Sequence, residues 1–302
     1  MRFNPNKKAY IYVSMVVLLW TTVPSAFKIS LRHLDFLHLV LYSSFVSLIV
    51  FLITLIIQQK LHLIITCSSR QYITSAFLGM LNPFIYYIIL FKAYSLLPAQ
   101  EAQPLNQTWA IILSVLSYLL LKQRLTVKSI AALFISFAGV VIISTHGNVL
   151  GMSFSNLPGA LLALGSAFFW ALFWLFNIKD KRDPVVKLTL NFLFGFLYIF
   201  ILMLLLGRIE LPSHPGFIGA VYVGIFEMGI TFVFWLKALE LSQNTARISN
   251  MIYLVPFLSL FVIRLVVGEH IRMSTIVGLC FIIGGIILQH YSPGQKASIP
   301  SG

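Results

Sequence analysis

The chain has 302 residues, of which 59% are hydrophobic and only 10% are charged, and its formal net charge is +13. The mean hydropathy is +0.93. A soluble domain carries about 25% charged residues, so this composition excludes an ordinary soluble protein. The Lys and Arg residues fall mainly at the ends of apolar segments, where they act as membrane topology signals. The positive charge is therefore not an indication of nucleic-acid binding.

Apolar segments long enough to cross a hydrocarbon core of about 30 Å recur along the whole chain. They predict an all-α integral membrane protein with ten transmembrane helices. The first apolar segment is longer than the core of a signal peptide, and many spans follow it, so we expect it to be retained. The expected spans are Tyr10–Phe27, His38–Ile57, Tyr72–Phe91, Pro98–Leu121, Val127–Thr145, Leu157–Asn177, Val185–Leu206, Phe217–Trp235, Thr245–Val267 and Met273–His290.

The distribution of basic residues predicts the orientation. Lys and Arg are most frequent at the N-terminus and in every second connector. By the positive-inside rule, both termini then lie in the cytoplasm and the protein is a multi-pass protein of a bacterial-type inner membrane. The two cysteines, Cys67 and Cys280, offer no disulfide framework.

The second half of the chain repeats the first. Because each half holds five expected spans, an odd number, the second half must enter the membrane inverted relative to the first. Inverted repeats are common in secondary transporters, which bind substrate near the midplane between the repeats. We expect repeat units at residues 1–150 and 151–291, followed by a disordered tail at 292–302. The matching positions are Trp20 with Trp170, Gly79 with Gly224, Lys92-Ala93 with Lys237-Ala238, and Ile130–Ile142 with Ile276–Leu288.

Several of these segments resemble a known family. Lys237-Ala-Leu, Asn250–Ile271 and Ser274–Leu288 look like the second half of EamA-type carriers of the drug/metabolite transporter superfamily. Leu105–Thr126 and the following "AALFISFAGVVII" resemble the same pattern in the first half. The resemblance implies a ten-helix transporter without a cofactor, and it does not indicate the substrate.

The first half departs from the family pattern at two positions. Ala110 stands where the family has Pro after the Trp, and Gln123 stands where it has Glu. The second half keeps both residues, as Pro256 and Glu269. Because proline interrupts helical hydrogen bonding, the fourth helix is expected to be straighter than the ninth.

Glu227 is the only charged residue between Phe217 and Trp235. A carboxylate at the centre of a membrane helix costs roughly 2.5–3.5 kcal/mol on insertion scales. Small residues share its helical face and large apolar residues occupy the opposite one, so Glu227 is expected to point into the protein. Two interpretations remain open: a structural carboxyl that joins helices, or a group that binds substrate or couples transport to protons.

Other polar and aromatic side chains fall on inward-facing stripes, where each could line a cavity or simply pack. In the fourth span, Gln103, Asn106 and Gln107 form either an interhelical seam or a cavity wall. An aromatic lining would suit a cationic or aromatic ligand. The remaining candidates are Trp20, Thr21, Asn82, Tyr86, Trp170, Trp174, Asn177, Thr231, Asn250 and Tyr253.

These features favour a secondary transporter that moves a small metabolite or drug-like solute, such as an amino acid or an aromatic or cationic compound, by alternating access. Export coupled to protons through Glu227 is one mechanism; facilitated diffusion or exchange is the alternative. The expected partners are this solute, protons and membrane lipid, with the chain a monomer or a homodimer. An intramembrane enzyme is disfavoured, because the sequence lacks HExxH and GxSG motifs and offers no acid partner for Glu227.

Overall fold

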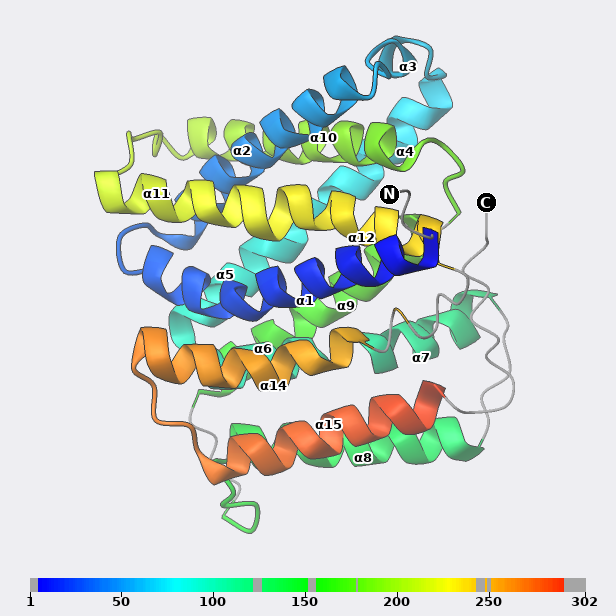
Figure 1. Cartoon of the computed structure of the whole chain (residues 1–302). Coiled ribbons are helices and arrows are strands. Elements are labelled where there is room, and N and C mark those ends of the chain that lie inside the picture. Colours follow the sequence, from blue (N-terminus) through cyan, green and yellow to red (C-terminus); the bar gives the residue numbers. More distant parts are fainter. Residues whose placement is uncertain are drawn as a thin grey trace.

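The computed structural model describes residues 5–121, 127–151, 156–177, 179–242, 248 and 251–290, and every regular element within them is a helix. Ten helical rods lie side by side, some of them built from consecutive helices (Figure 1). The first half contains α1 (Pro5–Ser30), α2 (Phe36–Ile57), α4–η1–α5 (Ser69–Gly79, Met80–Ile85, Tyr86–Leu96), α6–α7 (Ala99–Asn106, Trp109–Leu121) and α8 (Val127–Ser144); the short α3 (His62–Ile65) follows α2. The second half contains α9 (Leu157–Asn177), α10 (Pro184–Leu205), α11–η2–α12 (His214–Val223, Gly224–Gly229, Ile230–Leu241), η3–α14–η4 (Ile252–Leu254, Val255–Val262, Ile263–Val267) and α15 (Met273–His290).

Six of these rods are long and apolar enough to cross a membrane, and shorter apolar helices accompany them in the described part of the chain. Large apolar side chains such as Leu18, Ile73, Phe134 and Leu205 point outward from the bundle. A water-facing surface would not be covered in this way, whereas a lipid-facing surface requires it. The structure is therefore the all-α membrane protein that the composition predicts.

The two halves contact each other reciprocally, as expected for two related units. Helix α1 of the first half packs on α12 of the second, and α9 of the second packs on α5 of the first. In the same way α2 contacts η2 while α10 contacts η1. The equivalent helices α2 and α10 pack together, as do α8 and α15, which run side by side along one edge (Figure 1). The fold consists of two inverted five-helix repeats.

The repeat is visible in single contacts. A Cβ atom at Gly79 would lie 2.3 Å from the backbone oxygen of Asn191, and one at Gly224 would lie 2.7 Å from the backbone oxygen of Ser43. In both halves, a glycine of the third span therefore lets the second helix of the other half approach its backbone closely. In the second half this contact is reinforced, because Ser47 Oγ donates a hydrogen bond to the Gly224 carbonyl over 2.8 Å.

The fourth rod is not the straight helix that its Ala110 led us to expect. It is broken between α6 and α7, and Pro104 lies inside α6. Since proline cannot donate a backbone hydrogen bond, it weakens the helix just before the break. The Thr108 hydroxyl then donates to the Leu105 carbonyl over 2.7 Å and completes a tight turn. The ninth rod is also interrupted, since it passes from η3 through α14 to η4, so whether the fourth helix is straighter than the ninth stays a prediction.

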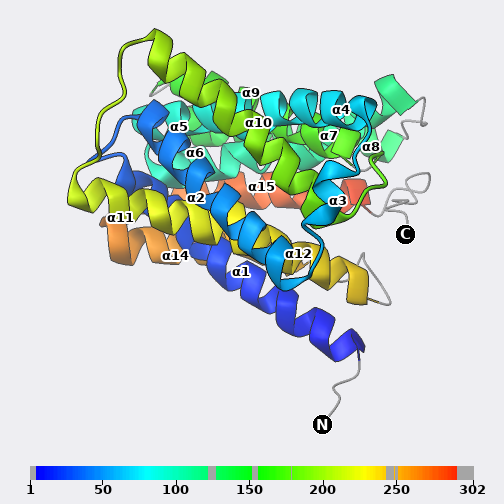
Figure 2. The ribbon, with the colours of Figure 1, turned by 90° about the horizontal axis from the view of Figure 1, so that it is seen from above.

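The start of α1 and the end of α15 lie at the same end of the bundle (Figure 1 and Figure 2). We call this the terminal end, and the opposite end the distal end. At the terminal end, Lys60 pairs with Asp183 over 2.6 Å. Burial alone would raise the pKa of Asp183, but hydrogen bonds from Lys60 and from the first backbone amides of α10 outweigh it and hold the pKa below its usual value. This carboxylate is therefore charged at neutral pH and joins the two halves.

Candidate functional site

Glu227 lies inside the bundle, with only 7% of its surface exposed. Its Oε1 accepts a hydrogen bond of 3.0 Å from the hydroxyl of Tyr87, which is fully buried on α5. The indole nitrogen of Trp20 approaches the same carboxylate but makes no hydrogen bond within the described residues. None of the ion pairs found in the described ranges includes Glu227. A buried carboxyl without a basic partner can hold a proton or receive a cationic ligand.

The backbone that carries Glu227 is interrupted. The eighth rod changes from α11 to the wide turn η2, and Gly229 has non-helical angles of φ −101° and ψ −97°. The Thr231 hydroxyl donates a hydrogen bond to the Phe226 carbonyl across this break. The interruption was not expected from the sequence. Gly224 and Gly229, at either end of η2, were a signal for it, because glycine permits backbone conformations that other residues avoid. Wide turns of this kind occur mostly at functional sites.

An aromatic cluster is connected to the carboxylate through Tyr87 and Trp20, and it joins both halves. The rings of Tyr86 and Trp170 lie 4.6 Å apart, and Trp170 stacks on Phe232 at 5.8 Å. Trp20 meets Phe232 edge to face at 6.4 Å. Faces of Trp, Tyr and Phe attract cations, and they also stack on flat apolar groups. The cluster therefore suits an organic cation or an aromatic solute.

The predicted amide stripe of the fourth rod makes interhelical hydrogen bonds. Gln103 Nε2 donates to Ser259 Oγ over 2.9 Å, and Asn106 Nδ2 donates to Ser166 Oγ over 2.9 Å. Tyr86 connects the stripe to the aromatic cluster, because its hydroxyl lies 3.4 Å from Asn106 Oδ1. Gln103 and Asn106 thus form the seam that was one of the two open interpretations, and the buried Gln103 oxygen keeps no partner among the described residues.

The other predicted residues within the described ranges lie on several helices of the bundle. Thr21 donates its hydroxyl to the Val17 carbonyl within α1. Asn177 lies at the end of α9, where its backbone carbonyl accepts from Lys187. Asn250 lies outside the described residues. Gln107, Trp174 and Tyr253 are half-buried, Thr231 is fully buried at the η2 break, and Asn82 is fully buried in η1.

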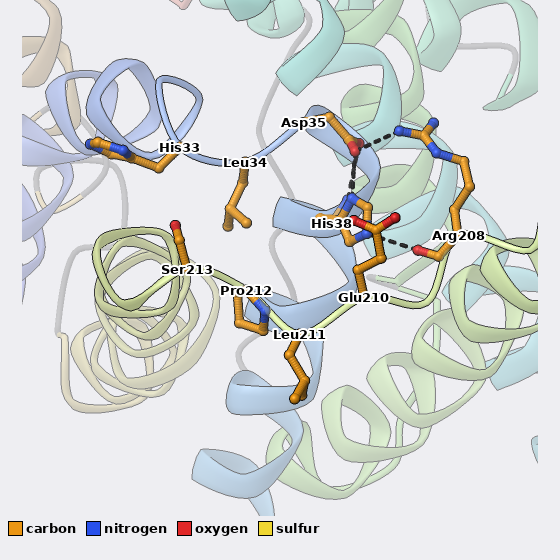
Figure 3. A pocket seen from close by; sticks show the side chains of 9 residues that line it. All are labelled: His33, Leu34, Asp35, His38, Arg208, Glu210, Leu211, Pro212 and Ser213. Carbon is orange, nitrogen blue, oxygen red and sulfur yellow. Dashed lines mark hydrogen bonds and ion pairs between the residues drawn. The ribbon is translucent and has the colours of Figure 1, made fainter.

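The distal end contains a small open cavity of about 240 Å³ between the α1–α2 loop and the α10–α11 loop (Figure 3). Asp35 lies between His38 and Arg208 and pairs with both, and the other His38 nitrogen faces the Arg208 backbone oxygen. Burial would raise the pKa of Asp35, but the hydrogen bonds from His38 and from backbone amides outweigh it and lower this pKa. These contacts tie two loops together, and Glu227 does not line this cavity.

A second group of polar contacts at the distal end links the two halves, and we call it the distal clamp. It consists of Gln100, Glu101, His146, Glu269 and Arg272. Both Glu269 oxygens accept backbone amides at the start of α6, from Ala99 over 2.8 Å and from Gln100 over 3.1 Å. Glu101 is 1% exposed and pairs with Arg272 over 2.6 Å and with His146 over 2.7 Å. The clamp therefore joins the two halves at the distal end.

Replacing Arg272 by Gln should destabilise the distal clamp. Removing one partner of a buried ion pair costs about 3–5 kcal/mol, but Arg272 is partly exposed, so we expect a loss of about 1–2 kcal/mol. Thermal unfolding of the variant in detergent measures this loss of stability. Lys237→Gln is the matched control, because its pair with Glu240 is exposed at the protein surface and should contribute less than about 1 kcal/mol. Equal melting temperatures for the two variants would contradict a stabilising clamp.

Several residues of these sites were not expected from the sequence. Tyr87 is the hydrogen-bond partner of Glu227. It directly follows Tyr86, which was a predicted site residue, and the sequence does not show which of the two rings faces Glu227. Glu101 and Glu269 were not selected as site residues, although they join the two halves. Asn191 was not selected, although an isolated amide within the apolar span Val185–Leu206 was a signal. Within the described ranges, no cluster of His, Cys, Asp and Glu could hold a metal ion.

The fold and these interhelical sites define a multi-pass membrane transporter built from two inverted repeats. The model of the EamA-like transporter family matches residues 7–145 and 157–289. The chain therefore belongs to the EamA-like transporter family, which agrees with the interpretation that it is not an enzyme.

Relatives support this membership, and a solved structure shares the fold. A protein of Clostridium kluyveri named an uncharacterized transporter is 26% identical, over 97% of this chain and 96% of that relative. One of Acidianus ambivalens, also named an uncharacterized transporter, is 30% identical over 70% of this chain and 83% of its own length. The aromatic amino acid exporter YddG of Ancylobacter novellus is 24% identical over 60% of this chain and 63% of the exporter. A crystal structure with 18% identity shares the fold with a TM-score of 0.65, covering 94% of this chain and 96% of that one.

Proposed function

We propose that the protein is a secondary carrier that exports a small amphipathic solute with a cationic group, in exchange for protons that bind at Glu227. The observation that carries this proposal is the Glu227 carboxylate, buried at an interrupted helix between the two halves and faced by Tyr87 and Trp20. A buried acid of this kind in a membrane protein usually marks a substrate or proton pathway.

The exchange follows from competition for one carboxylate. When the solute's cation pairs with Glu227, the proton leaves; when a proton returns, the carboxyl is neutral and the cation is released. Either occupant neutralises the buried charge, so the unoccupied carboxylate is the costly state during the change of access. Each turnover would then move one proton opposite to one solute.

The aromatic cluster supports the solute's chemistry. Trp170, Phe232 and Tyr86 offer ring faces within one continuous group of contacts. These faces bind cations and flat apolar groups, and the relative in Ancylobacter novellus is an aromatic amino acid exporter. The proposed location is the cytoplasmic membrane, with the terminal end facing the cytoplasm and residues 1–150 and 151–291 moving as the two units.

Purified protein in liposomes tests the proposal. With an acidic lumen, we expect phenyltrimethylammonium or L-tryptophan to accumulate inside, and a pH dye in the lumen should report alkalinisation during uptake. Liposomes without protein, and proteoliposomes without a gradient, are the controls. Uptake that equilibrates without accumulation, whatever the gradient, would favour facilitated diffusion or exchange. Absence of uptake for both probes would contradict the proposed substrate class.

A further inference from the structure

We propose that Asn82 and Asn191 form an amide subsite that binds the carboxylate of a zwitterionic solute, the ammonium group of which lies at Glu227. The substrate class would then be an amino acid with an aromatic or bulky apolar side chain. This inference rests on the proposed function and specifies the second end of the solute.

Both amides are fully buried and unpaired. Asn82 and Asn191 are each 0% exposed. The side-chain oxygen and nitrogen of both residues have no hydrogen-bond partner among the described residues. Most buried side-chain polar atoms in proteins are paired, so each exception calls for an explanation. Four unpaired polar atoms on the neighbouring elements η1 and α10 indicate side chains that hydrogen-bond to a ligand and do not stabilise the fold.

The two amides belong to one helix crossing. Asn191 lies on α10 where its backbone oxygen faces Gly79, the last residue of α4. One turn further along α10, Gly195 faces the ring of Pro83, which follows Asn82 directly. The extended backbone of Asn82, with φ −149° and ψ 120°, interrupts the third rod at this crossing. An interrupted helix in a membrane protein occurs where the backbone is buried in protein or lines a cavity.

The repeat and the neighbouring residues connect this crossing to the Glu227 site. Asn82 is related to Glu227 by the same sequence offset that relates Gly79 to Gly224, so the repeat places an amide in one half where the other half has an acid. Tyr87, which donates to Glu227, follows Asn82 by five positions and lies on α5, the helix that continues the third rod after the interruption. On the other side of the crossing, Phe192 follows Asn191 and meets Phe232 of the aromatic cluster at 6.2 Å.

The three groups together fit a zwitterion. Amide N–H groups donate to a carboxylate, and hydrogen bonds to a charged group are stronger than neutral ones. Glu227 accepts the ammonium, and the rings of Trp170 and Phe232 take the side chain. A simple cation would leave the amides unpaired, whereas an anion without an ammonium group would be repelled by the Glu227 carboxylate.

Binding of three matched probes to the detergent-purified full chain tests the subsite. L-Tryptophan carries both charges, tryptamine lacks the carboxylate, and indole-3-propionate lacks the ammonium. For Asn82→Leu and Asn191→Leu we expect about 10-fold to 100-fold weaker tryptophan binding, the value of a hydrogen bond to a charged group, with tryptamine binding unchanged. Gln58→Leu, an amide-to-leucine change at the terminal end of α2, is the control. Melting temperatures of all variants report folding, and Leu suits the extended backbone at position 82.

The remaining outcomes contradict either the amide subsite or the proposed substrate class. If both leucine variants bind tryptophan as the wild type does, or if they lose tryptophan and tryptamine equally, the amide subsite is wrong while the proposed function stands. If one of the two leucine variants does not fold, tryptophan and tryptamine binding by the other variant decides whether the subsite is correct. If the wild type binds none of the three probes, the proposed substrate class fails, and the subsite fails with it.

Discussion

Replacing Glu227 by Gln is expected to reduce solute accumulation driven by a pH gradient to the level of liposomes without protein. Glutamine has nearly the same shape, and its amide oxygen can still accept the hydrogen bond from Tyr87. It can neither exchange a proton nor pair with a cation, so both halves of the proposed exchange are lost. The variant should fold normally, because a neutral amide removes the cost of a buried charge.

The measurement compares accumulation in proteoliposomes with the melting temperature of the same preparation. Glu240→Gln is the matched control, since Glu240 lies on the same rod but is exposed and paired with Lys237. We expect it to transport as the wild type does. Accumulation by Glu227→Gln at the wild-type rate would return Glu227 to a structural role. A variant that loses gradient-driven accumulation but retains solute exchange would place only the proton step at Glu227.

The sequence predicts most of the fold because its strongest signal is hydrophobicity. Apolar segments of membrane length define the rods, and the recurrence of Gly79 as Gly224 reveals the two halves. The positions of the interruptions were only partly predictable. Pro83 is a signal in the sequence for the break in the third rod, because proline cannot donate a backbone hydrogen bond. The break at Gly229 depends on a glycine conformation that the helical pattern does not reveal.

The candidate site was harder to predict than the fold. The helical face of Glu227 follows from the small residues around it, so its burial could be expected. Its partner Tyr87 could not, because the contact joins helices of different halves. For the same reason, the contacts of Glu101 and Glu269 across the two halves could not be expected from the sequence. Contacts between inverted repeats bring together residues that are distant in sequence, and no local pattern records them.

Replacing Gly79 by Ala is expected to destabilise the protein more than any other single change proposed for this chain. The new Cβ would lie 2.3 Å from the Asn191 oxygen and 2.9 Å from the Gly195 nitrogen. Both are backbone atoms of α10, so a side-chain rotation cannot relieve the clash and the two helices must separate. Overpacking costs typically 1–3 kcal/mol, and loss of this crossing between the halves should bring the cost to about 3 kcal/mol or more.

Gly284→Ala provides the matched control for this substitution. Gly284 also lies in a helix, but nothing lies within 4 Å of the position of its Cβ. There alanine should stabilise the helix by about 0.5–1 kcal/mol, because glycine loses more backbone entropy on folding. The melting temperature in detergent should therefore fall for Gly79→Ala and rise for Gly284→Ala. If Gly79→Ala melts like Gly284→Ala, the close crossing of α4 and α10 is not what holds the halves together, and the amide subsite beside it loses its geometric basis.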